Sequence, residues 1–210
     1  MNRRYLTATI LFALLFTLAT SVLAESLERP IRRGAARGRG WHGEGFQGRT
    51  ILRVHMGLSA PTGDADNAFE TGWGMGTSVG YGVSRNVLLS WGIAYHRFGS
   101  EFTSGRLSVT PVTMSADVAL PTSGSVRPWF SGGLGLYHVS EKVTVLVPPF
   151  GFITASDSEN DFGINLGMGI TTPVSPRTAF GAGFKFHHII GNDFPDTDFI
   201  TFQAGFGLPL

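Results

Sequence analysis

The sequence predicts an all-β fold, an eight-stranded antiparallel up-and-down β-barrel that crosses a membrane. From residue 50 onward, large apolar residues alternate with small residues at a period of two, which is typical of strands. The small positions are mostly glycine, alanine and serine. The chain holds 29 glycines among its 210 residues, and only 15% of its residues are charged. A half-solvated soluble sheet would carry polar side chains on its water-facing side, so this composition favours a membrane protein.

Two segments precede the alternating pattern. Arg3 and Arg4 are followed by an apolar stretch over residues 6–19 and by the small residues at the end of residues 1–24. This order predicts a cleaved signal peptide, and the apolar run is short for the alternative, an uncleaved membrane anchor. Residues 25–48 carry five arginines among glycines and no hydrophobic period, which predicts a flexible basic lead-in on the periplasmic side. The barrel domain is expected at residues 49–210.

Eight segments show the alternation, each with its large residues at every second position. In chain order the large residues run through 52–58, 73–83, 89–95, 112–118, 130–136, 162–170, 180–186 and 200–208. Leu107 and Val109 precede the fourth segment with the opposite parity. This change of parity predicts a β-bulge near Pro111.

The size of the side chains assigns the two faces to two environments. A glycine in a strand costs about 0.5–1 kcal/mol relative to alanine, so a glycine-rich face in water would weaken the sheet without any gain. The interior of an eight-stranded barrel is just wide enough for side chains, and small residues fit there. Each large residue on the outside gains about 1.5–3 kcal/mol on leaving water. Closure also pairs every backbone group, as hydrocarbon requires.

The connections alternate between short turns and mostly longer loops. The short turns are expected at residues 84–86, 121–126 and 174–176, and the other loops at 60–71, 99–104, 140–160 and 191–197. Outer-membrane barrels keep short turns in the periplasm and longer loops outside. Acidic residues gather in or beside the longer loops, whereas Arg85, Arg127 and Arg177 lie at or beside the short turns. We therefore expect an acidic outer side.

These features resemble the small outer-membrane β-barrel domain family of Gram-negative bacteria, similar in shape to OmpA and OmpX. The resemblance covers residues 50–210 and is carried by residues 57–69 (GLSAPTGDADNAF), 109–121 (VTPVTMSADVALP), 127–137 (RPWFSGGLGLY) and the final strand. It implies an integral outer-membrane location. It also implies that the barrel-assembly machinery recognises the last strand, although the sequence ends on Leu210 where the family has an aromatic residue.

Polar residues on the small-residue face are predicted to form a network in the lumen. They are Arg53, His55, His96, Asp117, Lys185, His187 and Gln203. Buried charges must be paired, so we expect a packed, salt-bridged interior that holds the barrel closed, without catalysis and without a cofactor. A narrow pore is one alternative, although a barrel of this size leaves no open channel.

A lipid A-modifying enzyme is the other alternative, because some small outer-membrane barrels acylate or deacylate lipid A with a histidine and a serine near the outer rim. His187 and His188 lie near the outer end of their strand. No serine follows them at the spacing of such a nucleophile–base pair, so an enzyme is not expected.

The outward face and the loops carry the remaining candidates. Arg97, His138 and His188 fall on the lipid-facing parity at the outer ends of their strands, which predicts contacts with lipopolysaccharide phosphates. In the first longer loop, Asp64, Asp66 and Glu70 offer oxygen ligands to Ca²⁺ or Mg²⁺, but their spacing is not that of an EF-hand and solvated loop charge is favoured.

Charge excludes one class of partner. Without Arg3 and Arg4, 14 basic residues face 15 acidic ones, a net charge of −1, so no nucleic-acid partner is expected. The predicted role is structural or surface-interacting and adhesion-like. Its partners would be outer-membrane lipid, lipopolysaccharide and an unknown extracellular molecule at the loops.

Overall fold

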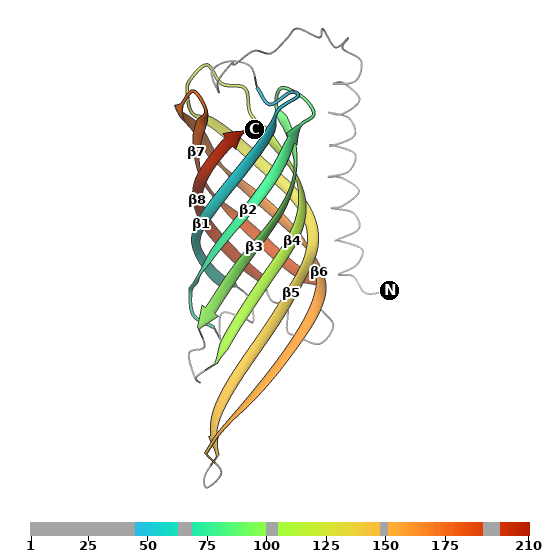
Figure 1. Ribbon diagram of the computed structural model, residues 1–210, viewed down its shortest axis with the longest axis vertical. Coiled ribbons are helices and arrows are strands. Elements are labelled where there is room, and N and C mark those ends of the chain that lie inside the picture. Colours follow the sequence, from blue (N-terminus) through green and yellow to red (C-terminus); the bar gives the residue numbers. More distant parts are fainter. Residues whose placement is uncertain (1–44, 63–68, 100–104, 148–150, 191–197) are drawn as a thin grey trace.

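The computed structural model describes residues 45–62, 69–99, 105–147, 151–190 and 198–210 (Figure 1). Its strands are β1 (Thr50–Thr62), β2 (Gly72–Gly82), β3 (Val87–Gly99), β4 (Arg106–Ala119), β5 (Arg127–Val147), β6 (Gly151–Ser175), β7 (Thr178–Ile190) and β8 (Asp198–Pro209). Each strand pairs antiparallel with the next, and β8 returns to β1 to close the barrel. The predicted eight-stranded antiparallel barrel is confirmed. The described residues include no helix long and apolar enough to span a membrane.

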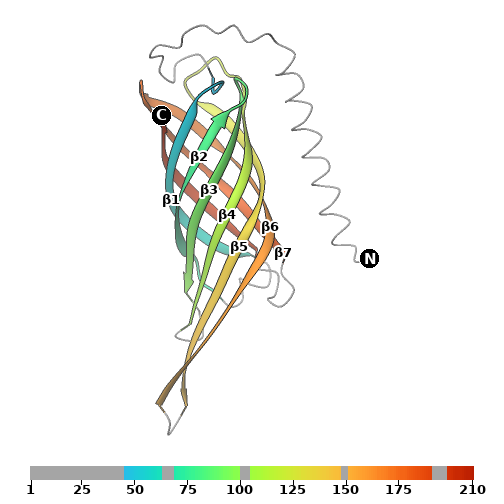
Figure 2. The same cartoon turned by 45° about the vertical axis from the view of Figure 1, so that its right-hand side comes forward.

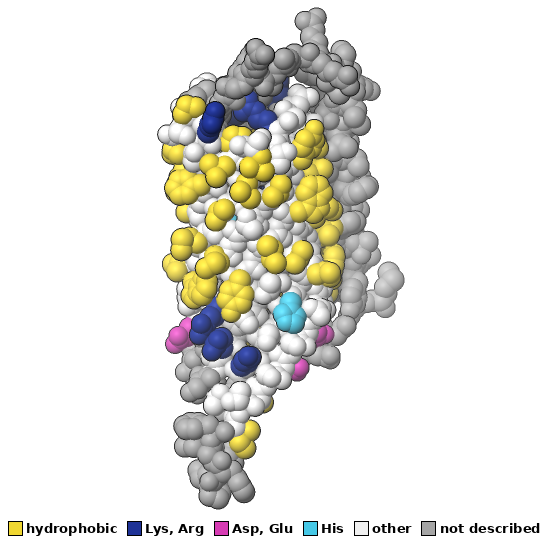
Figure 3. All heavy atoms as spheres, viewed as in Figure 1, with side chains coloured by type: hydrophobic (Ala, Val, Ile, Leu, Met, Phe, Trp, Pro, Cys, Tyr) yellow, Lys and Arg dark blue, Asp and Glu magenta, His cyan; other side chains and the backbone are white. Residues whose placement is uncertain are grey.

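Large apolar side chains cover the outside of the barrel. Met56 is 68% exposed, Trp91 55% and Phe202 58%, and each follows the parity predicted for the large face. Figure 3 shows hydrophobic side chains in a band across the visible face of the barrel. The neighbouring residues in each strand point into the lumen, as Arg53, His55 and Ser59 do in β1. A sheet with this surface needs an apolar solvent around it.

Glycines allow the one lumen-facing tryptophan of the described strands, Trp129, to lie directly against bare backbone. Gly169 and Gly183 are paired across β6 and β7. A Cβ on Gly169 would lie 2.6 Å from Trp129 Cζ2 and 2.7 Å from the Gly183 Cα. Small residues at these positions are therefore required by the crowded interior.

The predicted bulge near Pro111 is wrong. Between β3 and β4 the pairs Ile93↔Val112 and His96↔Val109 share one register, and β4 keeps one register with β5 through Pro111. The parity therefore does not change in β4, and both Leu107 and Val109 are buried on the lumen side. Near the loop end of β4 the apolar side chains therefore point into the lumen, whereas elsewhere in the strand they point outward.

The expected loop over residues 140–160 is mostly strand. β5 continues to Val147 and β6 starts at Gly151, and the two are paired up to Val147↔Gly151. The hydroxyl oxygens of Thr144 and Thr154 lie 3.0 Å apart across this hairpin. Figures 1 and 2 show it extending well beyond the other strands.

The opposite end of the barrel, where the short turns lie, is partly covered by the chain that enters β1. The Phe46 amide donates to the Arg85 carbonyl at 2.9 Å, and the Gly48 amide donates to the Gly82 carbonyl at 2.8 Å. Gly45 and Gly48 have φ values of 69° and 70°, a left-handed conformation that favours glycine. The last residues of the expected lead-in thus pack on the barrel, while residues 25–44 lie outside the described residues.

Candidate functional sites in the lumen and at the outer rim

The structure brings the predicted polar lumen residues together around one chamber. Its volume is about 140 Å³, and its lining includes Arg53, His55, His96, Asp117, Lys185, His187 and Gln203. They come from β1, β3, β4, β7 and β8. The chamber also reaches Phe46 at the short-turn end.

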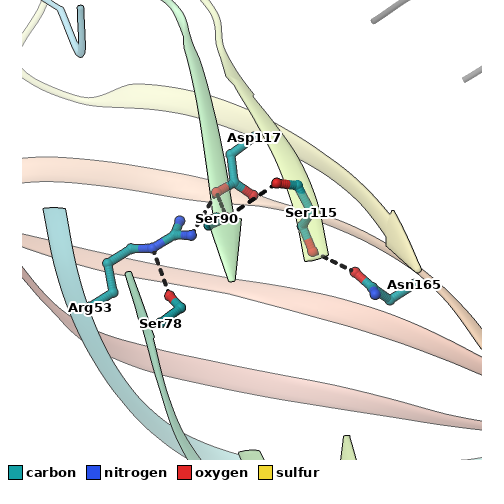
Figure 4. A network of polar contacts seen from close by, with 6 residues as sticks. All are labelled: Arg53, Ser78, Ser90, Ser115, Asp117 and Asn165. Atoms are coloured by element: carbon teal, nitrogen blue, oxygen red, sulfur yellow. Dashed lines mark hydrogen bonds and ion pairs between the residues drawn. The ribbon is translucent and has the colours of Figure 1, made fainter. Parts of the chain in front are cut away.

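An ion pair organises the polar side of this chamber. Arg53 Nη2 lies 2.6 Å from Asp117 Oδ2. The Ser90 hydroxyl donates to the same carboxylate oxygen at 3.0 Å, and Arg53 Nε donates to Ser78 Oγ at 3.2 Å. Figure 4 shows these residues converging from β1, β2, β3 and β4. The pair compensates the charges of Arg53 and Asp117 inside the barrel.

Serines extend this network, and their roles were not predicted from the sequence. The Ser115 hydroxyl donates to Asn165 Oδ1 at 3.3 Å (Figure 4). Ser59 Oγ is hydrogen-bonded to His96 Nδ1 at 2.8 Å. These serines stand at small-residue positions, so their parity was visible in the sequence, but the partner of each depends on the register between strands.

The histidines of the lumen have mainly packing roles. The Tyr137 hydroxyl is 3.0 Å from His187 Nδ1. The His187 ring stacks on Phe199 with 4.4 Å between centroids and 7° between planes. His96 also contacts Phe199, at 4.9 Å between centroids. His187 is therefore held between a hydrogen bond and a stacking contact.

Between the histidines and the long loops, the lumen is filled by an apolar cluster. Its buried members are Phe98, Leu107, Val109, Tyr137, Val139, Ile189 and Phe199, with Phe69 packed against them. None of these residues lines the chamber. Within the described strands the chamber is therefore closed toward the loop end.

The histidine pair considered for lipid chemistry is split between the two sides of the barrel wall. His187 is buried in the lumen, whereas His188 faces outward and its Nδ1 lies 2.7 Å from Asp198 Oδ1. Ser59 and His96 have the separation of a nucleophile–base pair, but both are buried inside the barrel. An acyl chain in the surrounding membrane does not reach them there.

The three residues predicted to contact lipopolysaccharide lie in different surroundings at the loop end of the barrel. Arg97 lies with Arg106 and Lys142 along a cleft, and we name these three residues the rim cleft. Arg106 and Lys142 are direct cross-strand partners. Figure 3 shows Lys and Arg side chains gathered below the apolar band. His138 is instead hydrogen-bonded to Asn160 at 2.9 Å, and His188 is paired with Asp198.

Sequence reasoning missed Arg106 and Lys142. Both are exposed and lie on the outward parity of β4 and β5, but Lys142 fell within the segment expected as a loop. Glu70, a candidate metal ligand, is exposed and its amide donates to the Gly99 carbonyl at 2.9 Å. Asp64 and Asp66 lie outside the described residues, and the described ones contain no cluster of three or more metal-ligating side chains.

A closed antiparallel barrel with an apolar exterior and a packed interior defines an integral membrane β-barrel protein. Residues 10–208 match the model of the family described as Outer membrane protein beta-barrel domain. The chain therefore belongs to this outer-membrane family. No curated protein sequence matches the chain.

Three solved structures share the fold. Neisserial surface protein A is 16% identical with a TM-score of 0.61, over 77% of this chain and 97% of that chain. The attachment invasion locus protein Ail of Yersinia pestis is 17% identical with a TM-score of 0.53, over 78% and 99%. The outer membrane protein OprG of Pseudomonas aeruginosa is 11% identical with a TM-score of 0.50, over 80% and 98%.

Proposed function

We propose that this outer-membrane barrel has a structural and surface-interaction role, in which the rim cleft binds phosphate groups of lipopolysaccharide in the outer leaflet. The observation that carries the proposal is the convergence of Arg97, Arg106 and Lys142 on one cleft directly beside the apolar band. Guanidinium and ammonium groups form charge-assisted hydrogen bonds with phosphate.

The position of the cleft supports a lipid ligand over a soluble one. Arg97 pairs across the sheet with Trp73, an outward aromatic residue that contacts Tyr95 at 5.8 Å between centroids. Tryptophan and tyrosine gather where a membrane meets water. A cation next to them lies at the depth of lipid phosphates. No described acidic residue forms an ion pair with the three cations.

The test is thermal unfolding of the refolded full chain with added lipopolysaccharide. We expect intact lipopolysaccharide to raise the Tm more than its dephosphorylated form, and the variant R97Q/R106Q/K142Q to lose most of that difference. The control is R85Q/R127Q/R177Q, which removes three cations at or beside the short turns and keeps the response. An unchanged response in the rim-cleft variant contradicts the proposal.

A role outside the membrane is supported by the β5–β6 hairpin. It extends past the remaining strands (Figures 1 and 2), so it offers the first surface that an extracellular partner meets. Replacing residues 143–156 by a short turn should leave the barrel folded and abolish capture of such a partner on intact cells. Retained capture by the shortened chain contradicts an adhesion-like role of the hairpin.

The apolar cluster supports a closed barrel over the alternative of a narrow pore. Buried Phe98, Tyr137 and Phe199 occupy the lumen at the loop end. We expect no unit conductance steps from the purified chain in planar bilayers. Regular single-channel steps that persist after repurification would favour the pore.

Export and assembly are part of the same proposal. Cleavage after Ala24 would leave Glu25 as the mature N-terminus, which mass spectrometry of the protein from outer membranes tests directly. The outward residues of β8, including Phe202, Phe206 and Leu208, form the strand that the assembly machinery would recognise. Replacing Leu210 by phenylalanine should preserve or increase the amount of assembled barrel.

A further inference from the structure

The chamber contains one more positive charge than its carboxylate can compensate. Arg53, Lys185 and Asp117 are its charged lining residues. Asp117 is already engaged by Arg53 at 2.6 Å and by the Ser90 hydroxyl at 3.0 Å. Lys185 is within electrostatic reach of Asp117, but it forms no hydrogen bond or ion pair with any described residue. Any protonated histidine of the lining would add to the positive charge.

An ammonium group at this place needs a counter-charge. Lys185 stands in β7 between Gly167 of β6 and Thr201 of β8, and its side chain turns into the chamber rather than to the outer surface. The apolar cluster separates this chamber from the loop end. A buried charge without a partner costs several kcal/mol, by order of magnitude. The chain nevertheless has a lysine at this position, among glycines and alanines.

The dimensions of the chamber limit what can supply the counter-charge. Its volume of about 140 Å³ is close to the roughly 150 Å³ of an engineered protein cavity that admits benzene. It therefore has room for a small inorganic ion together with a few water molecules. One excess positive charge is balanced by one monovalent anion.

We propose that the chamber is a binding site for one small monovalent inorganic anion of the chloride class, held by the Lys185 ammonium with the Arg53 guanidinium nearby. The Gln203 amide and the imidazoles of His55 and His96 line the same space and can donate further hydrogen bonds. Binding in the lumen does not depend on the rim cleft or on its lipid ligand, so either proposal can fail while the other stands.

Bromide is the probe, because it replaces chloride and scatters anomalously. Crystals of the full chain grown in sodium bromide should show an anomalous peak in the chamber within about 4 Å of Lys185 Nζ, a direct charge-assisted contact. The variant K185M should lose this peak. The control R177M, which removes a cation from an exposed turn, should keep it. A chamber that contains only water in the wild type, or a peak that persists in K185M, overturns the proposal.

A solution measurement covers the case in which K185M does not crystallise. The urea midpoint of unfolding is compared in sodium chloride and in sodium gluconate at equal ionic strength, because gluconate has the same charge as chloride but is a much larger organic anion. We expect chloride to raise the midpoint for the wild type and for R177M but not for K185M. Equal midpoints in the two salts for the wild type contradict an anion site.

Discussion

At the scale of single residues, the packing of the barrel interior depends on glycines and serines as much as on large side chains. Trp129 occupies the space over Gly169 and Gly183, and the Arg53–Asp117 pair reaches across strands because Ser78 and Ser90 are small. Glycine and serine therefore act here as packing residues. Large side chains fit inside only where small residues leave room for them, as Trp129 does over Gly169 and Gly183.

We predict that Gly169→Ala destabilises the barrel by about 1–3 kcal/mol, the usual cost of an overpacked interior. The added Cβ would meet the Trp129 ring and the backbone of Gly183, and the backbone cannot move aside cheaply. Urea unfolding of the refolded chain measures the loss. Gly124→Ala is the matched control, because a Cβ there has open space around it. Equal stability of the two variants would show that the lumen is looser than described.

We predict that Asp117→Ala costs about 3 kcal/mol in the free energy of unfolding, since it leaves a buried cation without its partner. The value is at the low end of the usual range because the Arg53 side chain is 33% exposed to the chamber. The exposed Asp157→Ala should change the free energy by less than about 0.5 kcal/mol. If Asp117→Ala behaves like this control, the ion pair does not organise the lumen.

The parity of the alternation was enough to place every predicted polar lumen residue on the inner side of the barrel. It was not enough to pair them. Whether Asp117 meets Arg53 or Lys185 depends on strand register and on the stagger around the barrel, which no single strand encodes. The stacking of His187 on Phe199 has the same origin.

At the scale of elements, the outward residues of each strand change from apolar to polar where the strand leaves the membrane. In β6 these run from Phe162 through Leu166 to Ile170 and are exposed apart from the half-buried Ile164. Beyond them toward the loops, Asn160 and Ser158 take over the outward positions. The apolar run of a strand therefore marks the segment that lies in hydrocarbon.

Leu166→Arg tests this assignment. A charge at the centre of the apolar run is expected to cost about 2–4 kcal/mol in lipid vesicles, and a charge near the interface about 0–1 kcal/mol. Val174→Arg, close to the β6–β7 turn, is therefore the control. Unfolding in vesicles compares the two. A Leu166→Arg variant as stable as Val174→Arg would place this face in water.

Two elements differed from expectation, β4 and the β5–β6 hairpin. Period-two alternation identifies a strand but does not say which face is apolar. At Leu107 and Val109 the apolar side chains point inward, so a continuous strand looked like a bulge. Residues 140–160 were expected as a loop, although the hairpin pairs them across β5 and β6. This pairing depends on the register between two strands, which the hydropathy of either strand alone does not give.

At the scale of the whole molecule, the barrel is a wall with a filled interior that differs along its axis. The short-turn end is partly covered by Phe46, the middle holds the charged chamber and the loop end is filled by the apolar cluster. The loop end also carries the rim cleft and the projecting β5–β6 hairpin. This arrangement explains how one small chain can be anchored in the outer membrane, remain closed and still present surface to its surroundings.

The most direct test of this account uses the tryptophans as reporters of their environment. Trp91 points outward and Trp129 points into the lumen. Two variants, one with Trp91 and one with Trp129 as its single tryptophan, are refolded into vesicles of lipids with brominated acyl chains. We predict strong quenching of Trp91 fluorescence and little quenching of Trp129. Equal quenching of both, or stronger quenching of Trp129, would contradict the placement of the large side chains in hydrocarbon.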